Sequence, residues 1–137
     1  MNRLSSSLPL WQTAGLTLIR ITLGVFMIYH GWEIFSEKDM NKYLQWDMFK
    51  NSFGKTLVYA GKGAELAGGV LLVFGLFTRI AALILVGTMA YITFFVGQGR
   101  IFTDEQYPFL FVLLAMVFLF IGGGKWSVDN LIFKKRN

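Results

Sequence analysis

Four long apolar runs constrain the fold of this chain more than any other feature. They cover about residues 12–35, 57–77, 80–97 and 105–121 of the 137 residues. A helix needs about 20 consecutive apolar residues to cross the hydrocarbon core of a bilayer, and each run is close to that length. We therefore predict an all-α membrane protein, an antiparallel bundle of four transmembrane helices that forms one domain over residues 1–137.

The composition agrees with a chain whose main partner is the lipid bilayer. Hydrophobic residues make up 55% of the sequence and charged residues 15%, whereas soluble domains carry about 25% charged residues. The net charge is +5, but no basic domain with stacking aromatic residues lies outside the apolar runs. This composition argues against nucleic-acid binding and favours anchoring of the basic residues at the membrane surface.

The connections between the runs carry their own signals. Residues 36–56 alternate charged and aromatic side chains at helix-like intervals, which predicts an amphipathic cap along the membrane interface between the first two helices. Thr78 and Arg79 alone separate the second and third runs as polar residues, so these helices should form a tight hairpin. Thr103 and Gln106 have the spacing of a capping box at the start of the fourth helix.

The basic residues give a weak indication of orientation. An even number of spans places both termini on one side, and the positive-inside rule assigns the more basic side to the cytoplasm. The cluster Lys134, Lys135 and Arg136 favours cytoplasmic termini, and we expect the protein in a bacterial cytoplasmic membrane. The competing basic residues on the opposite side are Lys38, Lys42, Lys50, Lys55 and Arg100.

Charged residues inside the apolar runs are the candidate functional site. Lys62 and Glu65 share one face of the second helix, and antiparallel packing should bring His30 and Glu33 of the first helix beside them. Ionisable groups at membrane depth are costly, so they pair or mark a working site. Arg20 is the fifth candidate, about 15 Å along the helix from His30. Its side chain either reaches toward Glu65 or extends to the terminal-side interface.

These residue types suit a neutral, partly polar ligand in an apolar cleft. His30, Lys62 and Glu65 can donate or accept protons, as the carbonyl oxygens of a quinone require. In the competing interpretation Lys62 and Glu65 only neutralise each other, and His30 is a packing residue. With no cysteine and one histidine, the sequence indicates neither a haem nor a metal site.

Other residues are predicted to have structural roles. Gly61, Gly68 and Gly75 recur every seven residues, a spacing that allows helices to approach closely, either within the chain or between copies in a homo-oligomer. Arg79 follows the predicted hairpin turn and reads as a structural or topology-setting residue.

Three segments together resemble the DoxX family of small four-helix membrane proteins. They are Arg20 with residues 30–33, residues 63–79, and the Gly-rich ending 122–129, which includes Ser127 and Asp129. One departure is Ile34, where the family pattern often has a lysine. The resemblance implies that Glu65, Arg20 and His30 matter most. It also implies that Ser127 and Asp129 form a structural cap, and we expect Asp129 to pair with Arg79 on the same side of the membrane.

The resemblance also sets expectations about function. Related DoxD-type proteins are membrane subunits of a thiosulfate:quinone oxidoreductase, so we expect a quinone-facing or anchoring subunit of an oxidoreductase complex, linked to respiration or oxidative-stress defence. Electron-carrying groups would belong to a peripheral or membrane redox partner, because no complete catalytic machinery is visible in this chain. The alternatives are a binding or transport protein for a lipid or small amphiphile, and a non-catalytic membrane scaffold.

Overall fold

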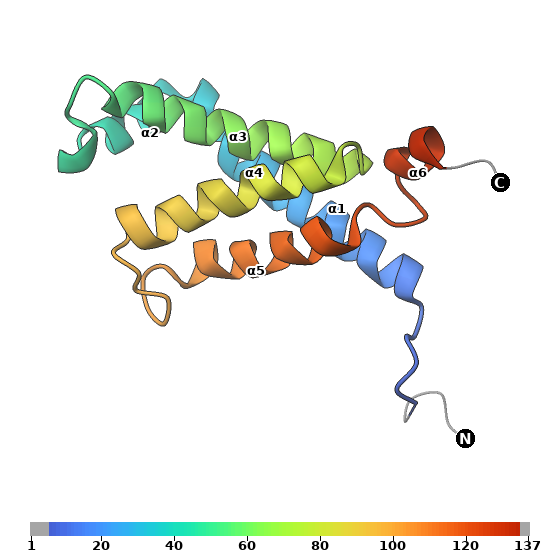
Figure 1. Cartoon of the computed structure of the whole chain (residues 1–137). Helices are drawn as coiled ribbons and strands as arrows, with labels where there is room; N and C mark the ends of the chain where they lie inside the picture. Colours follow the sequence, from blue (N-terminus) through green and yellow to red (C-terminus); the bar gives the residue numbers. More distant parts are fainter. Residues whose placement is uncertain (1–5, 135–137) are drawn as a thin grey trace.

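The computed structural model describes residues 6–134, and in this part of the chain every regular element is a helix (Figure 1). The four long helices α1, α3, α4 and α5 arise from the four apolar runs of the sequence. Short helices precede α3 and follow α5. The elements in order are α1 (Gln12–Gly31), the 3-10 helix η2 (Trp32–Phe35), α2 (Glu37–Leu44), the 3-10 helix η3 (Asp47–Phe49), α3 (Gly54–Phe74), α4 (Thr78–Tyr91), the π-helix η4 (Ile92–Val96), α5 (Gln106–Ile121) and α6 (Val128–Phe133).

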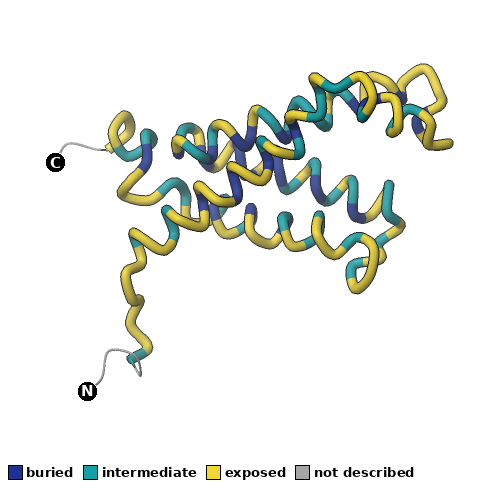
Figure 2. The backbone as a smooth tube through the Cα atoms, turned by 180° about the vertical axis from the view of Figure 1, so that it is seen from behind, coloured by how far each residue is buried: buried dark blue, intermediate teal, exposed yellow. Residues whose placement is uncertain are grey.

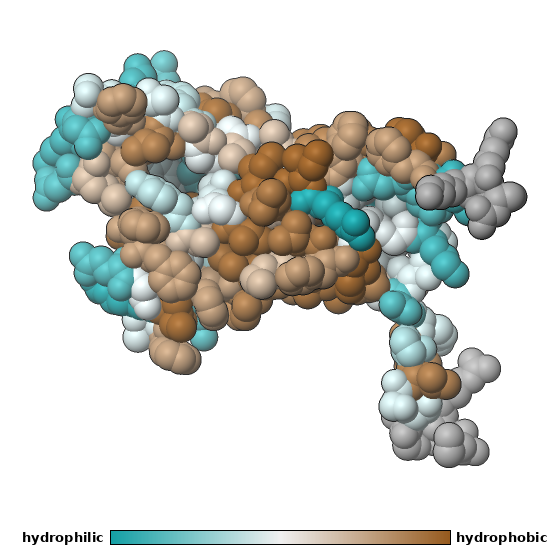
Figure 3. Space-filling view, viewed as in Figure 1, coloured by the Kyte–Doolittle hydropathy of each residue, from teal (hydrophilic) through white to brown (hydrophobic). Residues whose placement is uncertain are grey.

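Three helical segments are long and apolar enough to cross a membrane: Gln12–Phe35, Gly54–Phe74 and Thr78–Val96. Most of their surface faces outward, and Figure 3 shows this surface as largely hydrophobic. The fourth run forms α5, a shorter apolar helix of 16 residues. At 1.5 Å per residue, α5 is about 24 Å long, less than the roughly 30 Å of a hydrocarbon core.

The second and third helices begin and end earlier than the sequence predicts. Gly75 ends α3 in the left-handed region at φ 66°, where glycine carries no Cβ penalty. The amide of Leu76 then donates to the carbonyl of Leu71 at 2.9 Å, which closes the helix end. The predicted turn residues Thr78 and Arg79 instead form the first turn of α4.

Helices α1 and α3 pack antiparallel through glycines. A Cβ atom built on Gly69 would lie 2.7 Å from the carbonyl oxygen of Gly24, so neither position has room for a larger side chain. The buried core continues through α4 and α5, which cover one another and contact the α1–α3 pair. Figure 2 shows these buried positions along the inner sides of the helices. The core residues include Leu23, Met27, Leu72, Leu85, Met89 and Phe118.

The three glycines of the seven-residue pattern have different surroundings. A Cβ on Gly68 would lie 2.9 Å from Cγ of Leu85, which places Gly68 at the α3–α4 contact. Gly61, by contrast, has open space where its side chain would be. Gly61 therefore makes no close helix contact within residues 6–134, and packing between copies in a homo-oligomer stays a prediction for this position.

The connection before α3 folds back onto the helices. Ser36 caps α2 by accepting a hydrogen bond from the amide of Asp39 at 3.3 Å. Met40 and Phe49 are buried against Val58 of α3 in a second, smaller core. The predicted capping box at Thr103 and Gln106 is wrong, because the residue that precedes α5 is Glu105 and no side chain caps this helix.

Candidate functional site

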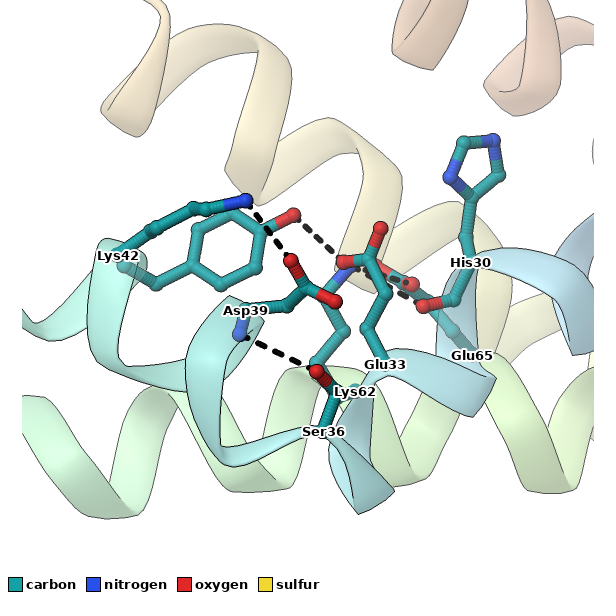
Figure 4. Close-up of polar contacts among 8 residues, drawn as sticks. His30, Glu33, Ser36, Asp39, Lys42, Lys62 and Glu65 are labelled. Atoms are coloured by element: carbon teal, nitrogen blue, oxygen red, sulfur yellow. Dashed lines mark hydrogen bonds and ion pairs between the residues drawn. The ribbon is translucent and has the colours of Figure 1, made fainter.

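The end of α1 and the middle of α3 bring four of the predicted residues together (Figure 4). His30 is in the last turn of α1, Glu33 follows in η2, and Lys62 and Glu65 lie one turn apart on α3. Helix α2 adds Tyr43 to this group through a hydrogen bond. We call Glu33, Tyr43, Lys62 and Glu65 the polar cluster.

Lys62 occupies the centre of the polar cluster. Its Nζ atom lies 3.0 Å from Oε2 of Glu33 and 3.1 Å from Oε2 of Glu65. It also donates to the backbone carbonyl of His30 at 3.3 Å. The Lys62 side chain is 11% exposed and that of Glu65 only 3%. A buried ammonium between two carboxylates has the partners that burial requires.

Tyr43 closes the outer side of the polar cluster. Its hydroxyl donates to Oε2 of Glu33 at 2.7 Å, and its ring centroid lies 4.9 Å from Nζ of Lys62. Burial, and then the hydrogen bond to Glu33, raise the pKa of Tyr43 above its ordinary value of 10.0. The phenol is therefore a hydrogen-bond donor at neutral pH.

His30 contacts the polar cluster through its backbone, whereas the sequence predicted a contact through its side chain. Its backbone carbonyl binds Lys62, whereas its imidazole points away from the polar cluster (Figure 4). The ring lies edge-on to Phe111 of α5, with 6.1 Å between centroids, and edge-on to Tyr29 at 5.6 Å. No side-chain hydrogen bond of His30 is present within residues 6–134.

A cavity of about 820 Å³ adjoins the polar cluster. It lies between α3, α4 and α5 under the connection that contains α2 and η3, and His30 and Glu65 belong to its wall. Most of the wall is apolar or aromatic, as is typical of sites for small organic ligands. Its aromatic members are Tyr43, Trp46, Phe49, Tyr91, Tyr107 and Phe111.

Arg20 does not join the polar cluster. Its guanidinium donates to the carbonyl oxygens of Leu72 at 3.0 Å, Trp126 at 2.8 Å and Gly123. The residue is 2% exposed. The sequence left two directions open for this side chain, toward Glu65 or toward the side of the termini. The side chain points toward the side of the termini, where it binds backbone carbonyls and does not extend into the membrane interface.

The remaining predicted structural residues surround this arginine. The carboxylate of Asp129 accepts hydrogen bonds from the amides of Phe77 at 2.6 Å and Thr78 at 2.8 Å, which caps α4. Ser127 caps α6 by accepting from the amide of Asn130 at 3.2 Å. The expected pairing of Asp129 with Arg79 is wrong, since the described residues contain no such ion pair and Arg79 reaches the carbonyl of Phe120 instead.

Residues 6–134 contain no group of three histidine or carboxylate side chains that could hold a metal ion. The polar cluster offers two carboxylates, but a lysine already occupies the space between them.

Apolar helices of spanning length around a charged internal cluster define an integral membrane protein. A family model described as DoxX matches residues 15–98, which include most of α1, all of α3 and α4, and the whole polar cluster. The chain belongs to the DoxX family. It is also 32% identical to an uncharacterized protein of Haemophilus influenzae, an alignment that covers 98% of this chain and 100% of the relative. No solved structure matches it significantly.

Tyr43 is the member of the polar cluster that sequence reasoning missed. It was grouped with the interfacial aromatic residues of segment 36–56, because nothing in the spacing distinguishes it from Trp46. The position of Glu33 relative to this segment was the available signal. A carboxylate one turn before a folded-back helix favours a further donor on that helix, and the hydroxyl of Tyr43 supplies one beside Lys62.

Proposed function

We propose that this protein binds an isoprenoid-type quinone in the cavity beside the polar cluster and acts as the quinone-facing subunit of a membrane oxidoreductase complex. The observation that carries the proposal is the combination of an apolar cavity of about 820 Å³ with a buried charged cluster in its wall. A quinone has an apolar ring and tail and two oxygens that require polar partners. The cavity offers both environments within one chain.

The chain's own residues would bind and orient the quinone and exchange protons with it. Reduction of a quinone to a quinol takes up two electrons and two protons. Glu65 and His30 face the cavity and are suited to proton exchange, since histidine and buried carboxylates are the usual proton-exchanging groups. The electrons would pass to or from a flavin or metal centre in a partner subunit.

Mass spectrometry of organic extracts from gently purified protein tests this proposal. Gly61→Leu is the informative variant, because Gly61 lines the cavity and its side-chain direction is open, so leucine fills the cavity without a clash. Gly15→Leu is the matched control, since Gly15 also has open space but lies on α1 away from the cavity.

We expect quinone to be enriched in the wild type and in Gly15→Leu and to be absent from folded Gly61→Leu. Enrichment of another amphiphile with the same dependence on Gly61 would replace the quinone by a lipid-binding or transport function. If extracts contain only bulk phospholipid, unchanged by Gly61→Leu, the ligand-binding proposal fails and a scaffold role becomes the one to test.

We also propose that α5 is a fourth span and that both termini are cytoplasmic. Helix α5 packs against α4, touches α1 and exposes apolar side chains such as Leu113 and Phe120, which supports contact with lipid. In Figure 1 the beginning of α1 and helix α6 lie at the same end of the long helices. Of the basic cluster used for orientation, Lys135 and Arg136 lie outside the described residues.

The absence of natural cysteines makes the topology directly measurable. Single cysteines introduced as Lys125→Cys and Lys50→Cys should react with a membrane-impermeant maleimide from opposite sides of the membrane. Labelling of both positions from one side of sealed vesicles would contradict a fourth span. Labelling of Lys125→Cys from outside intact cells would reverse the orientation.

A further inference from the structure

We infer that the polar end of the cavity binds a hydrogen-bond donor, so that the site prefers the hydroxyl form of its ligand, a quinol, over the carbonyl form, a quinone. This inference rests on the proposed function and specifies which form of the ligand the site retains. It concerns binding alone and involves no electron transfer.

The first observation is that the donors of the polar cluster are already used. An ammonium group has three N–H donors, and Nζ of Lys62 is surrounded by three oxygen atoms, from Glu33, Glu65 and the carbonyl of His30. The hydroxyl of Tyr43 donates to Glu33. No donor of the cluster remains free to bind the carbonyl oxygen of a quinone.

The second observation is that acceptors remain. Lys62 binds only Oε2 of Glu65, and no described residue donates to the other oxygen, Oε1. Glu65 belongs to the cavity wall. A carboxylate oxygen with free lone pairs beside an apolar cavity provides a place for a hydroxyl or another N–H or O–H donor.

The charge of the site points in the same direction. Two carboxylates and one ammonium give the polar cluster a formal charge of minus one. Two further acidic residues, Asp47 and Glu105, belong to the cavity wall, whereas Lys62 is its one lysine or arginine. An electron-rich carbonyl or an anionic head group is therefore disfavoured relative to a donor head group.

His30 does not favour either the quinol or the quinone. A neutral imidazole has one N–H donor and one acceptor nitrogen, and the ring of His30 faces the cavity without a hydrogen-bond partner in the described structure. It can therefore serve the second oxygen of either form. The preference between the two forms depends on Glu65.

The test is equilibrium binding of matched ligand pairs to the full chain in lipid nanodiscs. The first pair is a decyl-substituted benzoquinone and its benzoquinol, the latter kept reduced under nitrogen. The second pair is redox-inert, 4-decylphenol and its methyl ether, which differ only in the O–H donor. We expect the donor member of each pair to bind about tenfold more tightly, the effect of one good hydrogen bond to a charged acceptor.

Glu65→Gln should bring both ratios close to one, because an amide donates as readily as it accepts. Glu37→Gln is the matched control, since Glu37 is exposed on α2, and it should keep the wild-type ratios. Size-exclusion chromatography reports whether each variant is folded. The redox-inert pair tests the inference on the wild type alone if Glu65→Gln does not fold.

The possible results separate the two proposals. Equal or tighter binding of the quinone and of the methyl ether would overturn the donor preference and leave the proposed quinone site in place. Binding of neither member of either pair to the wild type would overturn both. A tenfold preference that survives Glu65→Gln would show that Glu65 is not its source and would also overturn the inference.

Discussion

Two regions of the molecule bury a basic side chain among apolar helices, and they satisfy it in different ways. Arg20, near the terminal side, binds three backbone carbonyls, and no ion pair to it is present among residues 6–134. Lys62, near the opposite end of the helices, binds two carboxylates and one carbonyl. A cavity adjoins Lys62, whereas Arg20 is enclosed by helix ends and the Gly-rich segment 122–124.

The difference in partners favours a structural role for Arg20 and a binding role for the region around Lys62. Backbone carbonyls do not titrate. The one from Leu72 belongs to α3, and those from Gly123 and Trp126 lie in the connection between α5 and α6. The carboxylates around Lys62 are side chains with free acceptor positions, and they can exchange partners when a ligand enters. A buried charge marks both regions. They differ in the groups that bind the charge, which are backbone carbonyls for Arg20 and side-chain carboxylates for Lys62.

Arg20→Leu should give the largest loss of stability. The substitution leaves the carbonyls of Gly123 and Trp126 without a donor, each at a cost of about 1–3 kcal/mol. It also removes the hydrogen bond to the carbonyl of Leu72, which keeps the amide of Gly75 as a donor, so the free energy of unfolding in detergent should fall by at least about 3 kcal/mol. Arg79→Leu is the control, because Arg79 is exposed and makes one long contact of 3.5 Å. Similar small effects of both variants would contradict the structural role of Arg20.

Lys62→Met should destabilise the protein less than Arg20→Leu, by about 2–3 kcal/mol, because Glu33 is 29% exposed and part of its charge remains solvated. Addition of Glu65→Gln should restore about 1 kcal/mol by removing one of the uncompensated carboxylates. A double-mutant cycle with denaturant unfolding measures this coupling. Strictly additive effects would show that Lys62 and Glu65 do not interact energetically.

Asp129→Ala tests the segment that encloses Arg20. It removes the cap of α4, at an expected cost of about 1–2 kcal/mol. Asp104→Ala removes only an exposed ion pair with Arg100 and should stay within about 0.5 kcal/mol of the wild type. The order of the two midpoints in one thermal unfolding series is the measurement, and a reversed order would contradict the capping role.

Tyr43→Phe should have the smallest effect, about 1 kcal/mol from one hydrogen bond to Glu33. Folding raises the pKa of Tyr43, so its contribution is complete below its ordinary pKa of 10.0 and is lost as the pH rises through the folded value. In unfolding curves, wild type and variant should therefore differ by about 1 kcal/mol at pH 7, and this difference should shrink as the pH rises through the folded pKa of Tyr43, which lies above 10.0. A constant difference would show that the phenol does not titrate in this range.

The pairing of Lys62 with Glu65 could be predicted because both partners lie one turn apart on one helix. Local spacing fixes their common face, and antiparallel packing adds Glu33. The spanning runs were predictable for the same local reason. The ends of the helices were less predictable. Gly75 ends α3 in a left-handed conformation, and the first turn of α4 is capped by Asp129, which is 52 residues from Phe77 along the chain.

The surroundings of Arg20 could not be predicted from local patterns. Its partners are backbone carbonyls at positions 72, 123 and 126, and a carbonyl has no signature in the sequence. The surroundings of Gly61 within the chain were not predictable either. Its spacing matches that of Gly68, but Gly61 lines the cavity, whereas Gly68 meets Leu85 of α4.

The contacts of Arg20 also impose an order on biosynthesis. The first helix leaves the ribosome with its arginine long before Gly123 and Trp126 are translated, because chains are made from the N-terminus. The carbonyl of Leu72, one of the three acceptors of Arg20, is translated with α3. The other two acceptors are translated only after α5. The contacts of Arg20 are therefore complete only once the segment that ends at Trp126 has been translated, and every shorter nascent chain carries the arginine without two of its three acceptors.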